Sequence, residues 1–467
     1  MEGLNLEIID SIDKELLLLN NQISFLEFQE TTEATDHSEK IQSLEYEIYR
    51  MLHSNIVRDL LSRFSPIDPV QQHKMNILQG LVRFSVIEYH PDILSIRKRV
   101  KKTLSELHYF DHINTLMNEA SQDKRKQAHL KISEFCSYND DLFKEFIHTH
   151  NRIAHQNGYA NYAEAKLDSE GLTEKEFTDF FLTIHQNGRS IVQEWVHDNQ
   201  GKIESFDVYH SFKDLKPSLD WKPNNSKNLL NHLLTDFQIS LSELPISISW
   251  QKMDFAGACF RIKPGKDVRL VINQDLEGLS VLHYALHELG HAIYYCFCPI
   301  DSELLLDNHL SREIMADIWT NCLEDPYFLK KAFQADEMDI QRYLIKKMKY
   351  DQLNLQIQSR DAVFIYEAFK NPDVSLSKIW TQITEYWLEI DDTYGGYDVF
   401  DFFAPLDQKS YAFSYVLARQ LFLDVTQQRK NPFASSENLK YMREKLFSSG
   451  SLIDWKKKFY FGKRNYG

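Results

Sequence analysis

The spacing of apolar residues constrains this sequence most: from residue 5 to about residue 240 they recur at i, i+3, i+4 and i+7. The stretch "IQSLEYEIYRMLHSNIVRDLLSRF", residues 41 to 64, is one example. This spacing gathers apolar side chains on one face of a helix, and that face is stable only against another apolar surface. The first half of the chain is therefore predicted to be a lobe of packed amphipathic helices.

Four stretches rich in Pro, Gly, Asn or Ser interrupt this pattern and predict where helices end. They are "SPIDP" at 65–69, "SYND" at 137–140, "QNGY" at 156–159 and "KPSLDWKPNNSKN" at 216–228. In "LTEKEFTDFF", Thr173 and Glu176 have the spacing of a capping box, which predicts the start of a further helix.

The period changes near residue 246, where "ISISW" and "CFRIKPGKDVRLVIN" alternate apolar with polar residues around Pro264 and Gly265. This pattern predicts a small β-hairpin. The stretch "LEGLSVLHYALHELGHAIYYCF" then predicts a helix, followed by more helices. We expect a mainly α protein with one domain over 1–467, divided into a helical N-terminal lobe at 1–240 and a catalytic lobe at 241–467.

An HExxH pattern, His287-Glu288-Leu289-Gly290-His291, lies on the predicted helix that follows the hairpin. Positions i and i+4 share one helix face, so two imidazoles can bind one zinc ion there. The intervening Glu288 would then act as general base toward a water that the metal activates. Because the pattern also occurs by chance, a third ligand is needed to support it.

A third ligand is offered by Glu313 in "SREIMADIW", 22 residues after His291 on another helical pattern. Asp317 follows one turn later on the same face, where it can accept the outer N–H of a ligating histidine and fix its orientation. We therefore predict one catalytic zinc ion per chain, held by His287, His291 and Glu313.

Other ligand candidates are less favourable. His283 is one turn before His287, but choosing it as a ligand would leave Glu288 without a role, so packing or a hydrogen bond behind the site is expected. Glu303 lies in "PIDSELLLDNH", which resembles a loop and a short helix rather than a ligand platform. Three further histidines are expected to be structural or exposed: His148, His150 and His155.

Composition excludes some classes of partner. The net charge of −15 argues against nucleic-acid binding, which depends on Lys and Arg contacts to phosphate. No segment offers about 18 uncharged apolar residues, and the N-terminal stretch resembles no signal peptide, so no membrane partner is expected. Five dispersed cysteines, including the buried thiols expected at Cys296 and Cys298, fit a reducing cytoplasm.

Several ordered motifs resemble the zinc region of the angiotensin-converting-enzyme family and, more distantly, of the thimet oligopeptidase (neurolysin-like) and oligoendopeptidase F families, all of the gluzincin type. The stretch "FRIKPGKDVRLVINQDLEGLSVLHYALHELGHAIYY" is followed by "SREIMADIW", in the same order as the corresponding motifs of the angiotensin-converting-enzyme family. Asp254, Phe255, Leu276 and Glu277 also match motifs of that family. The closing "LFSSGSLIDWKKKFYFGKRN" and "NGYANYAEAKL" at 157–167 are similar too.

The resemblance implies a two-lobed helical peptidase with a deep central channel and zinc at its floor. Such a channel admits oligopeptides and excludes folded proteins. The strand "DVRLVIN", which contains Val271, is expected to be an edge on which an extended peptide adds main-chain hydrogen bonds.

The resemblance also implies a tyrosine that stabilises the oxyanion. Aligning "SYAFSYVLARQLF" with the family places Tyr411 there, and Tyr415 is the substitute; packing is the alternative role for Tyr411. Tyr397 in "DTYGGYD", 392–398, is a further candidate for substrate binding, although that stretch is equally typical of a simple turn.

The sequence departs from the angiotensin-converting enzymes where these place two substrate-binding histidines and an arginine. Here "ISISWQKMDF" and "FDFFAPLDQKSY" contain no histidine, and Ser410 replaces the arginine. We therefore predict a cytoplasmic zinc oligopeptidase without uniform release of C-terminal dipeptides. Two alternatives stay open, a thermolysin-like endopeptidase and a catalytically silent peptide-binding relative.

Overall fold

The computed structural model describes most of the chain, which forms two compact units. The first comprises residues 1–89, 218–340 and 413–455, and the second residues 90–217, 341–412 and 456–467. The described residues are 2–33, 35–64, 68–106, 109–199, 201, 203–213, 244–253, 255–275, 278–297, 301–305, 309–392, 395–397, 399, 402 and 405–427. The unit division does not follow the predicted boundary near residue 240, because residues 1–89 belong with the sheet and the HExxH helix.

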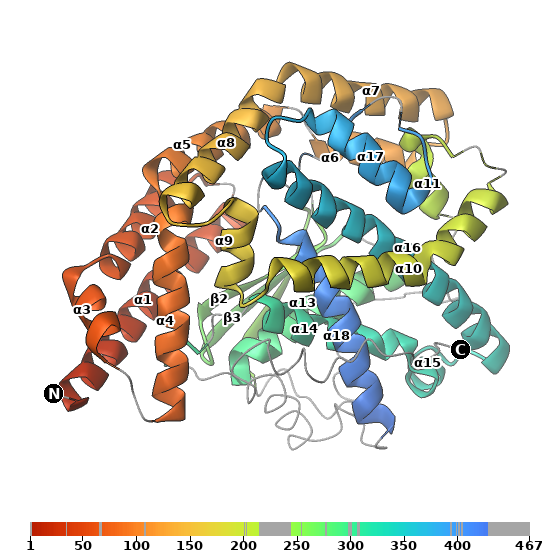
Figure 1. The fold of residues 1–467 in the computed structure, drawn as a ribbon. Coiled ribbons are helices and arrows are strands. Elements are labelled where there is room, and N and C mark those ends of the chain that lie inside the picture. The colour runs from red at the N-terminus through yellow and green to blue at the C-terminus, as the bar shows by residue number, and fades with distance from the viewer. Residues whose placement is uncertain are drawn as a thin grey trace. The chain divides into compact units, whose positions relative to one another are not determined.

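The first unit contains the sheet and the helices around it (Figure 1). Its elements are α1 (Glu2–Glu33), α2 (Ser38–Leu52), α3 (Asn55–Arg63), α4 (Pro69–Glu88), β1 (Ile246–Gln251), β2 (Gly257–Lys263), β3 (Asp267–Asn273), α13 (Gly278–Phe297), α14 (His309–Thr320), the 3-10 helix η3 (Asn321–Glu324), α15 (Pro326–Phe333) and all but the start of α18 (Gln408–Gln427). Its α1–α4 segment is helical, as the apolar spacing predicts.

The second unit is helical in its described part. Its elements are α5 (Pro91–Glu106), α6 (Tyr109–Asn118), α7 (Gln122–Tyr138), α8 (Asp140–Gln156), α9 (Tyr162–Ser169), α10 (Glu174–Asp198), the 3-10 helix η1 (Ser205–Asp207), α11 (Val208–Lys213), most of α16 (Glu337–Lys370), α17 (Leu376–Leu388) and the start of α18. Its core is rich in aromatic rings, such as Phe143, Phe146 and Phe369. Among the described helices, none has an apolar stretch long enough to span a bilayer.

Local capping signals set several helix boundaries. Thr173 and Glu176 form the predicted capping box at the start of α10. The amphipathic stretch 41–64 is helical in two parts, α2 and α3. The Ser54 side chain caps the start of α3 by accepting a hydrogen bond from the Val57 N–H. The predicted breaks at 137–140 and 156–159 coincide with the C-terminal ends of α7 and α8. Of the break at 65–69, Pro69 is the first residue of α4, whereas residues 65–67 lie outside the described residues, as does the break at 216–228.

The predicted hairpin is confirmed as β2 and β3, which pair antiparallel. The Lys266 N–H donates to the Lys263 carbonyl across the turn, and Gly265 has φ +67°, a conformation that favours glycine. The Gly265 N–H also donates to the Tyr295 carbonyl near the end of α13. The hairpin is thereby attached to the HExxH helix.

Strand β1 pairs parallel with β3, so the order of the three-stranded sheet is β1-β3-β2. The prediction that β3 is an edge strand is therefore wrong, because β3 is the central strand and its main chain is paired on both sides. Successive side chains along each strand point to opposite faces of the sheet. Gly257 and its partner Ile272 share one face, whereas Phe260 and its partner Arg269 share the other.

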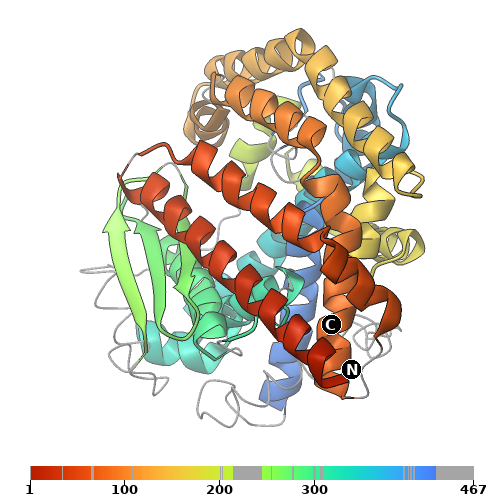
Figure 2. The same cartoon turned by 90° about the vertical axis from the view of Figure 1, so that its left-hand side faces the viewer.

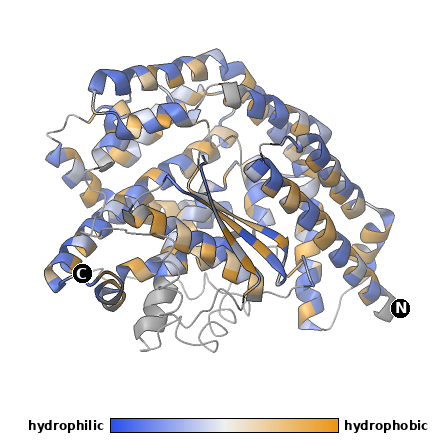
Figure 3. Cartoon of the chain, turned by 180° about the vertical axis from the view of Figure 1, so that it is seen from behind, coloured by the Kyte–Doolittle hydropathy of each residue, from blue (hydrophilic) through white to orange (hydrophobic). Residues whose placement is uncertain are grey.

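Both faces of the sheet are covered within the first unit. Gly257 approaches Glu288 of α13, so α13 packs on the first face. The rings of Phe260 and Phe28 are 5.5 Å apart, and Arg269 lies over the Phe28 ring, so α1 packs on the second (Figure 2). Residues 270–273 of β3 are consequently buried, and Figure 3 shows orange, apolar segments along the strands.

Candidate metal centre

Helix α13 presents the two histidines of the HExxH pattern on one face. His287 and His291 are separated by one turn, and their ring centroids are 4.9 Å apart. Their side chains stay partly open, at 17% and 13% exposure, whereas Leu286 and Leu289 are fully buried. The apolar residues anchor the helix in the core, and the histidines point toward a neighbouring helix.

Helix α14 lies beside α13 and brings Glu313 to both histidines (Figure 1). Glu313 Oε2 is 3.5 Å from His287 Nε2, and Glu313 Oε1 is 3.7 Å from His291 Nε2. The predicted ligand set of His287, His291 and Glu313 is thus brought together at one place in the first unit.

The three side chains fit a divalent metal ion. Their ligand atoms all lie within 4.8 Å of one another. Ligands about 2.0–2.1 Å from a tetrahedral zinc ion are separated by roughly 3.3 Å, which is close to the contacts observed here. Two imidazoles and one carboxylate suit zinc, and three protein ligands leave a fourth position open.

The electrostatics of the cluster also favour a cation. Burial by itself lowers the pKa of His287, but hydrogen bonds and charges from Asp317 and Glu313 outweigh burial and raise this pKa well above its ordinary value. The same carboxylates that stabilise a proton on the imidazole would stabilise a metal ion beside it.

Asp317 occupies the position predicted for an orienting residue. Its Oδ1 is 3.1 Å from Nδ1 of His287, the ring nitrogen that faces away from Glu313. A carboxylate at Nδ1 fixes the ring orientation and leaves Nε2 available as the metal-binding nitrogen.

Glu288 is buried beside the cluster. A Cβ atom on Gly257 would lie 3.0 Å from Glu288 Cγ, so the absence of a side chain at Gly257 makes room for the glutamate. Burial raises the pKa of Glu288 to about 7, while His287 lowers it and Glu313 raises it. A carboxyl group with a pKa near neutrality is suited to general acid–base chemistry.

Gly290 determines how closely α13 and α14 approach, a role that the sequence pattern did not reveal. A Cβ atom there would lie 2.5 Å from the Ala316 Cα and 2.9 Å from the Met315 carbonyl oxygen. These are main-chain neighbours that cannot rotate away. The contact sets the separation of Glu313 from the histidines.

We expect Gly290→Ala to destabilise the metal-free protein by about 1–3 kcal/mol, because the added methyl group forces the two helices apart. Alanine in an open helix position would instead stabilise by up to about 1 kcal/mol. Urea unfolding shows whether Gly290→Ala lowers or raises the free energy of unfolding. Zinc titration should show that the variant binds zinc more weakly than the wild type. A stabilised variant with unchanged zinc affinity would contradict the role given to Gly290.

The competing ligand candidates have other contacts. His283 is not in the three-ligand cluster found among the described residues, and its ring packs against Tyr284. Glu303, 3% exposed, forms an ion pair with Arg261 and accepts a hydrogen bond from Asn20. The described residues 301–305 around it are not helical.

The remaining histidines differ in their surroundings, as expected. His150 is fully buried, with Nδ1 2.8 Å from the Phe146 carbonyl oxygen. His148 and His155 are exposed. Among the thiols, burial raises the pKa of Cys296 to about 12, whereas Cys298 lies outside the described residues.

The predicted tyrosine positions lie in different surroundings. Tyr411 is 37% exposed in the first turns of α18 and belongs to the second unit, whereas the metal cluster lies in the first; its role stays a prediction. Tyr415 belongs to the first unit, and its hydroxyl accepts a hydrogen bond from Arg419, which pairs with Glu324.

Two predicted substrate residues are buried in this structure. Val271 is fully buried in β3 and pairs with Ala258 on the sheet face opposite Gly257. Tyr397 is 1% exposed, and its hydroxyl donates to the Cys136 carbonyl within the aromatic core of the second unit. Neither side chain is open to a peptide. Asp254, Leu276, Glu277 and the closing motif at 446–465 lie outside the described residues.

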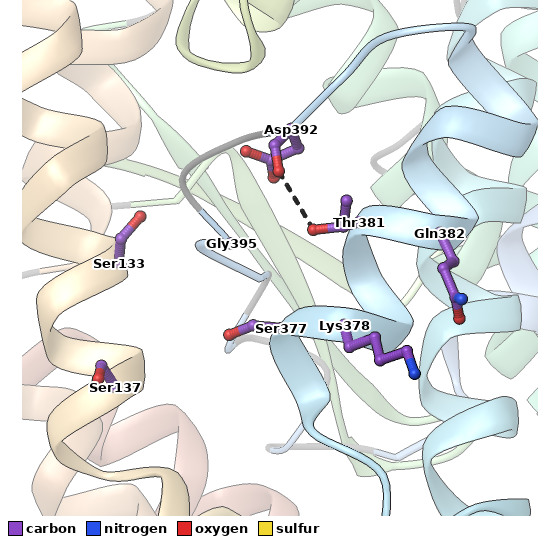
Figure 4. A pocket seen from close by; sticks show the side chains of 8 residues that line it. All are labelled: Ser133, Ser137, Ser377, Lys378, Thr381, Gln382, Asp392 and Gly395. Atoms are coloured by element: carbon purple, nitrogen blue, oxygen red, sulfur yellow. Dashed lines mark hydrogen bonds between the residues drawn. The ribbon is translucent and has the colours of Figure 1, made fainter.

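A polar hollow in the second unit is lined in part by residues of the predicted substrate stretch 392–398 (Figure 4). It is lined by Ser133, Ser137, Ser377, Lys378, Thr381, Gln382, Asp392 and Gly395. The Asp392 carboxylate accepts from Trp380 Nε1, and its carbonyl accepts from Thr381 Oγ1. A Cβ atom on Gly396 would lie 2.5 Å from Ser133 Oγ, so this part of 392–398 packs closely on α7. Packing accounts for these glycines without a substrate.

Solved structures of peptidases share the fold of this chain. M32 carboxypeptidase from Deinococcus radiodurans R1 aligns with a TM-score of 0.67 and 12% identity, over 95% of this chain and 92% of that one. Trypanosoma cruzi metallocarboxypeptidase 1 aligns with a TM-score of 0.62 and 12% identity, over 97% and 91%. A protein assigned as an oligoendopeptidase F aligns with a TM-score of 0.60 and 16% identity, over 86% and 77%.

These TM-scores show a shared fold, which in this chain is mainly helical with a small sheet, as predicted. No protein-family profile matches the chain, and no curated protein sequence matches it. The kinship with the angiotensin-converting enzymes and thimet oligopeptidase therefore stays a prediction.

Proposed function

We propose that this chain is a cytoplasmic zinc-dependent oligopeptidase. The observation that carries the proposal is the cluster of His287, His291 and Glu313 on two adjacent helices, with Asp317 behind one histidine and buried Glu288 alongside. The fold shared with peptidases supports it, and the dispersed cysteines are consistent with a reducing compartment.

In this proposal His287, His291 and Glu313 hold the zinc ion, which when bound polarises the scissile carbonyl and activates a water molecule. Glu288 accepts a proton from the attacking water and later passes it to the leaving amine. Its burial, which raises the pKa to about 7, suits both steps. Tyr411, or Tyr415 in its place, donates a hydrogen bond to the oxyanion.

The sheet offers a place for an extended peptide at β2 rather than at β3. Among the described residues, β2 pairs with a strand on one side only, and its Gly257 lies next to Glu288. A peptide added along this strand would carry its main chain past the general base. The loss of the two histidines and the arginine of the angiotensin-converting enzymes supports cleavage without uniform release of C-terminal dipeptides.

Incubation of the zinc-loaded protein with a mixed peptide library tests this function. We expect cuts in short peptides, read by mass spectrometry, that disappear with a chelator and return when zinc is added. Magnesium alone serves as the control for metal identity. Uniform dipeptide release would contradict the proposed specificity, and an uncut library would favour a catalytically silent peptide-binding protein.

A further inference from the structure

Ser414, a residue without a place in the ligand pattern, contacts the metal centre from a third helix. It lies on α18 and is fully buried, and its Oγ donates to Oδ2 of Asp317 at 2.5 Å. The two residues are separated by 97 positions in the sequence, and both belong to the first unit.

The Asp317 carboxylate is shared between two donors. Its Oδ1 faces His287 Nδ1 at 3.1 Å, while Oδ2 accepts from Ser414. The main-chain carbonyl of Asp317, by contrast, accepts from Thr320 and Asn321, which leaves the carboxylate for the histidine and the serine. Each carboxylate oxygen therefore has its own partner.

This arrangement restricts the orientation of the His287 ring, one of the three candidate metal ligands. The Ser414 hydroxyl opposes rotation of the carboxylate about its Cβ–Cγ bond, and the carboxylate fixes the His287 ring. Without the hydroxyl, Oδ2 would lose its donor on a side chain that is only 16% exposed, at a cost typical of an unsatisfied polar atom.

We propose that Ser414 is a positioning residue of the metal centre, which holds Asp317 and through it the imidazole of His287. This inference rests on the proposed metal-dependent function. The serine acts through two other residues and touches neither metal nor substrate. It also attaches α18, the helix that carries Tyr415, to the metal-binding helix α14.

Zinc affinity, measured by competition with a chromogenic chelator at fixed pH, tests this inference without any substrate. We expect Ser414→Ala to weaken zinc binding about threefold to tenfold, less than the roughly 10–100-fold lost when a direct partner of a ligand is removed. In an Asp317→Ala background, Ser414→Ala should have no further effect, because the group through which it acts is absent.

Ser410→Ala is the matched control. Ser410 is 2% exposed and lies one turn earlier on α18, so its substitution has a similar cost in packing. We expect it to leave zinc affinity unchanged. The inference is overturned by unchanged affinity in Ser414→Ala, by an equal loss with and without Asp317, or by an equal loss in Ser410→Ala.

The outcomes also separate this inference from the proposed function. Wild-type protein that binds zinc but cuts no peptide contradicts the peptidase function, while the affinity cycle still supports or overturns the role of Ser414. Wild-type protein that binds no zinc overturns both. Thermal unfolding of each metal-free variant confirms that the comparisons are made on folded protein.

Discussion

Glu288→Gln is expected to lower kcat for peptide hydrolysis by about 10²–10⁴-fold, the usual contribution of a general base, while zinc remains bound. Glutamine has nearly the same shape as glutamate but cannot accept the proton from water. The substitution also removes a buried carboxyl group whose pKa is already raised to about 7, so no loss of folding stability is expected.

Glu313→Gln provides the contrast, because it changes a ligand rather than the base. That variant should lose zinc as well as hydrolysis, whereas Glu288→Gln should lose hydrolysis alone. Steady-state kinetics on one peptide from the library, with bound zinc measured in the same samples, separates the two. Undiminished hydrolysis by Glu288→Gln would refute the assignment of this residue as the base.

The second large effect concerns stability. Glu303→Ala should lower the free energy of unfolding by about 3–5 kcal/mol, the range for removing one partner of a buried ion pair. Arg261 donates to Glu303 through both Nη1 and Nη2, and the two side chains are only 13% and 4% exposed. Without Glu303, the buried guanidinium loses its counter-ion.

Urea unfolding of the metal-free protein measures this effect, with Asp301→Ala as the control. Asp301 is exposed two residues earlier, so its substitution should change stability by no more than about 0.5 kcal/mol. The double variant Arg261→Met with Glu303→Leu should recover much of the loss, because it leaves no unpaired charge. Equal stability of Glu303→Ala and Asp301→Ala would contradict this account.

Glu303 lies in the chain segment between α13 and α14, the two helices that carry the candidate metal ligands. The next residue, Leu304, donates its main-chain N–H to Asp13 Oδ1, and Ser302 Oγ donates to Asp13 Oδ2. Asp13 itself pairs with Lys74 of α4. Buried carboxylates on α1 and in the connector thus hold the segment that joins the two ligand helices.

Much of the candidate site could be predicted because its signals are local. His287, Glu288 and His291 depend on helical periodicity within five residues, and Asp317 follows Glu313 by one turn. The hairpin was also predictable, because Pro264 and Gly265 define its turn. A missed local signal was Ser54, whose capping side chain begins α3 within the amphipathic stretch 41–64.

Other features depend on contacts between distant segments. The parallel pairing of β1 with β3 makes β3 a central strand and buries Val271, which no alternation pattern reveals. The polar partners of Glu303 lie on α1 and β2, and the donor to Asp317 lies on α18. Sequence spacing carries no information about such pairs.

The sequence by itself therefore determined the helices, the hairpin and the identity of the side chains in the candidate metal centre, because each depends on neighbours within one or two turns. The tertiary structure alone decided the separation of α13 and α14 at Gly290, the edge strand near Glu288, and the support of Asp317 by Ser414. These features require segments remote in sequence to pack together, and packing depends on the whole set of buried side chains.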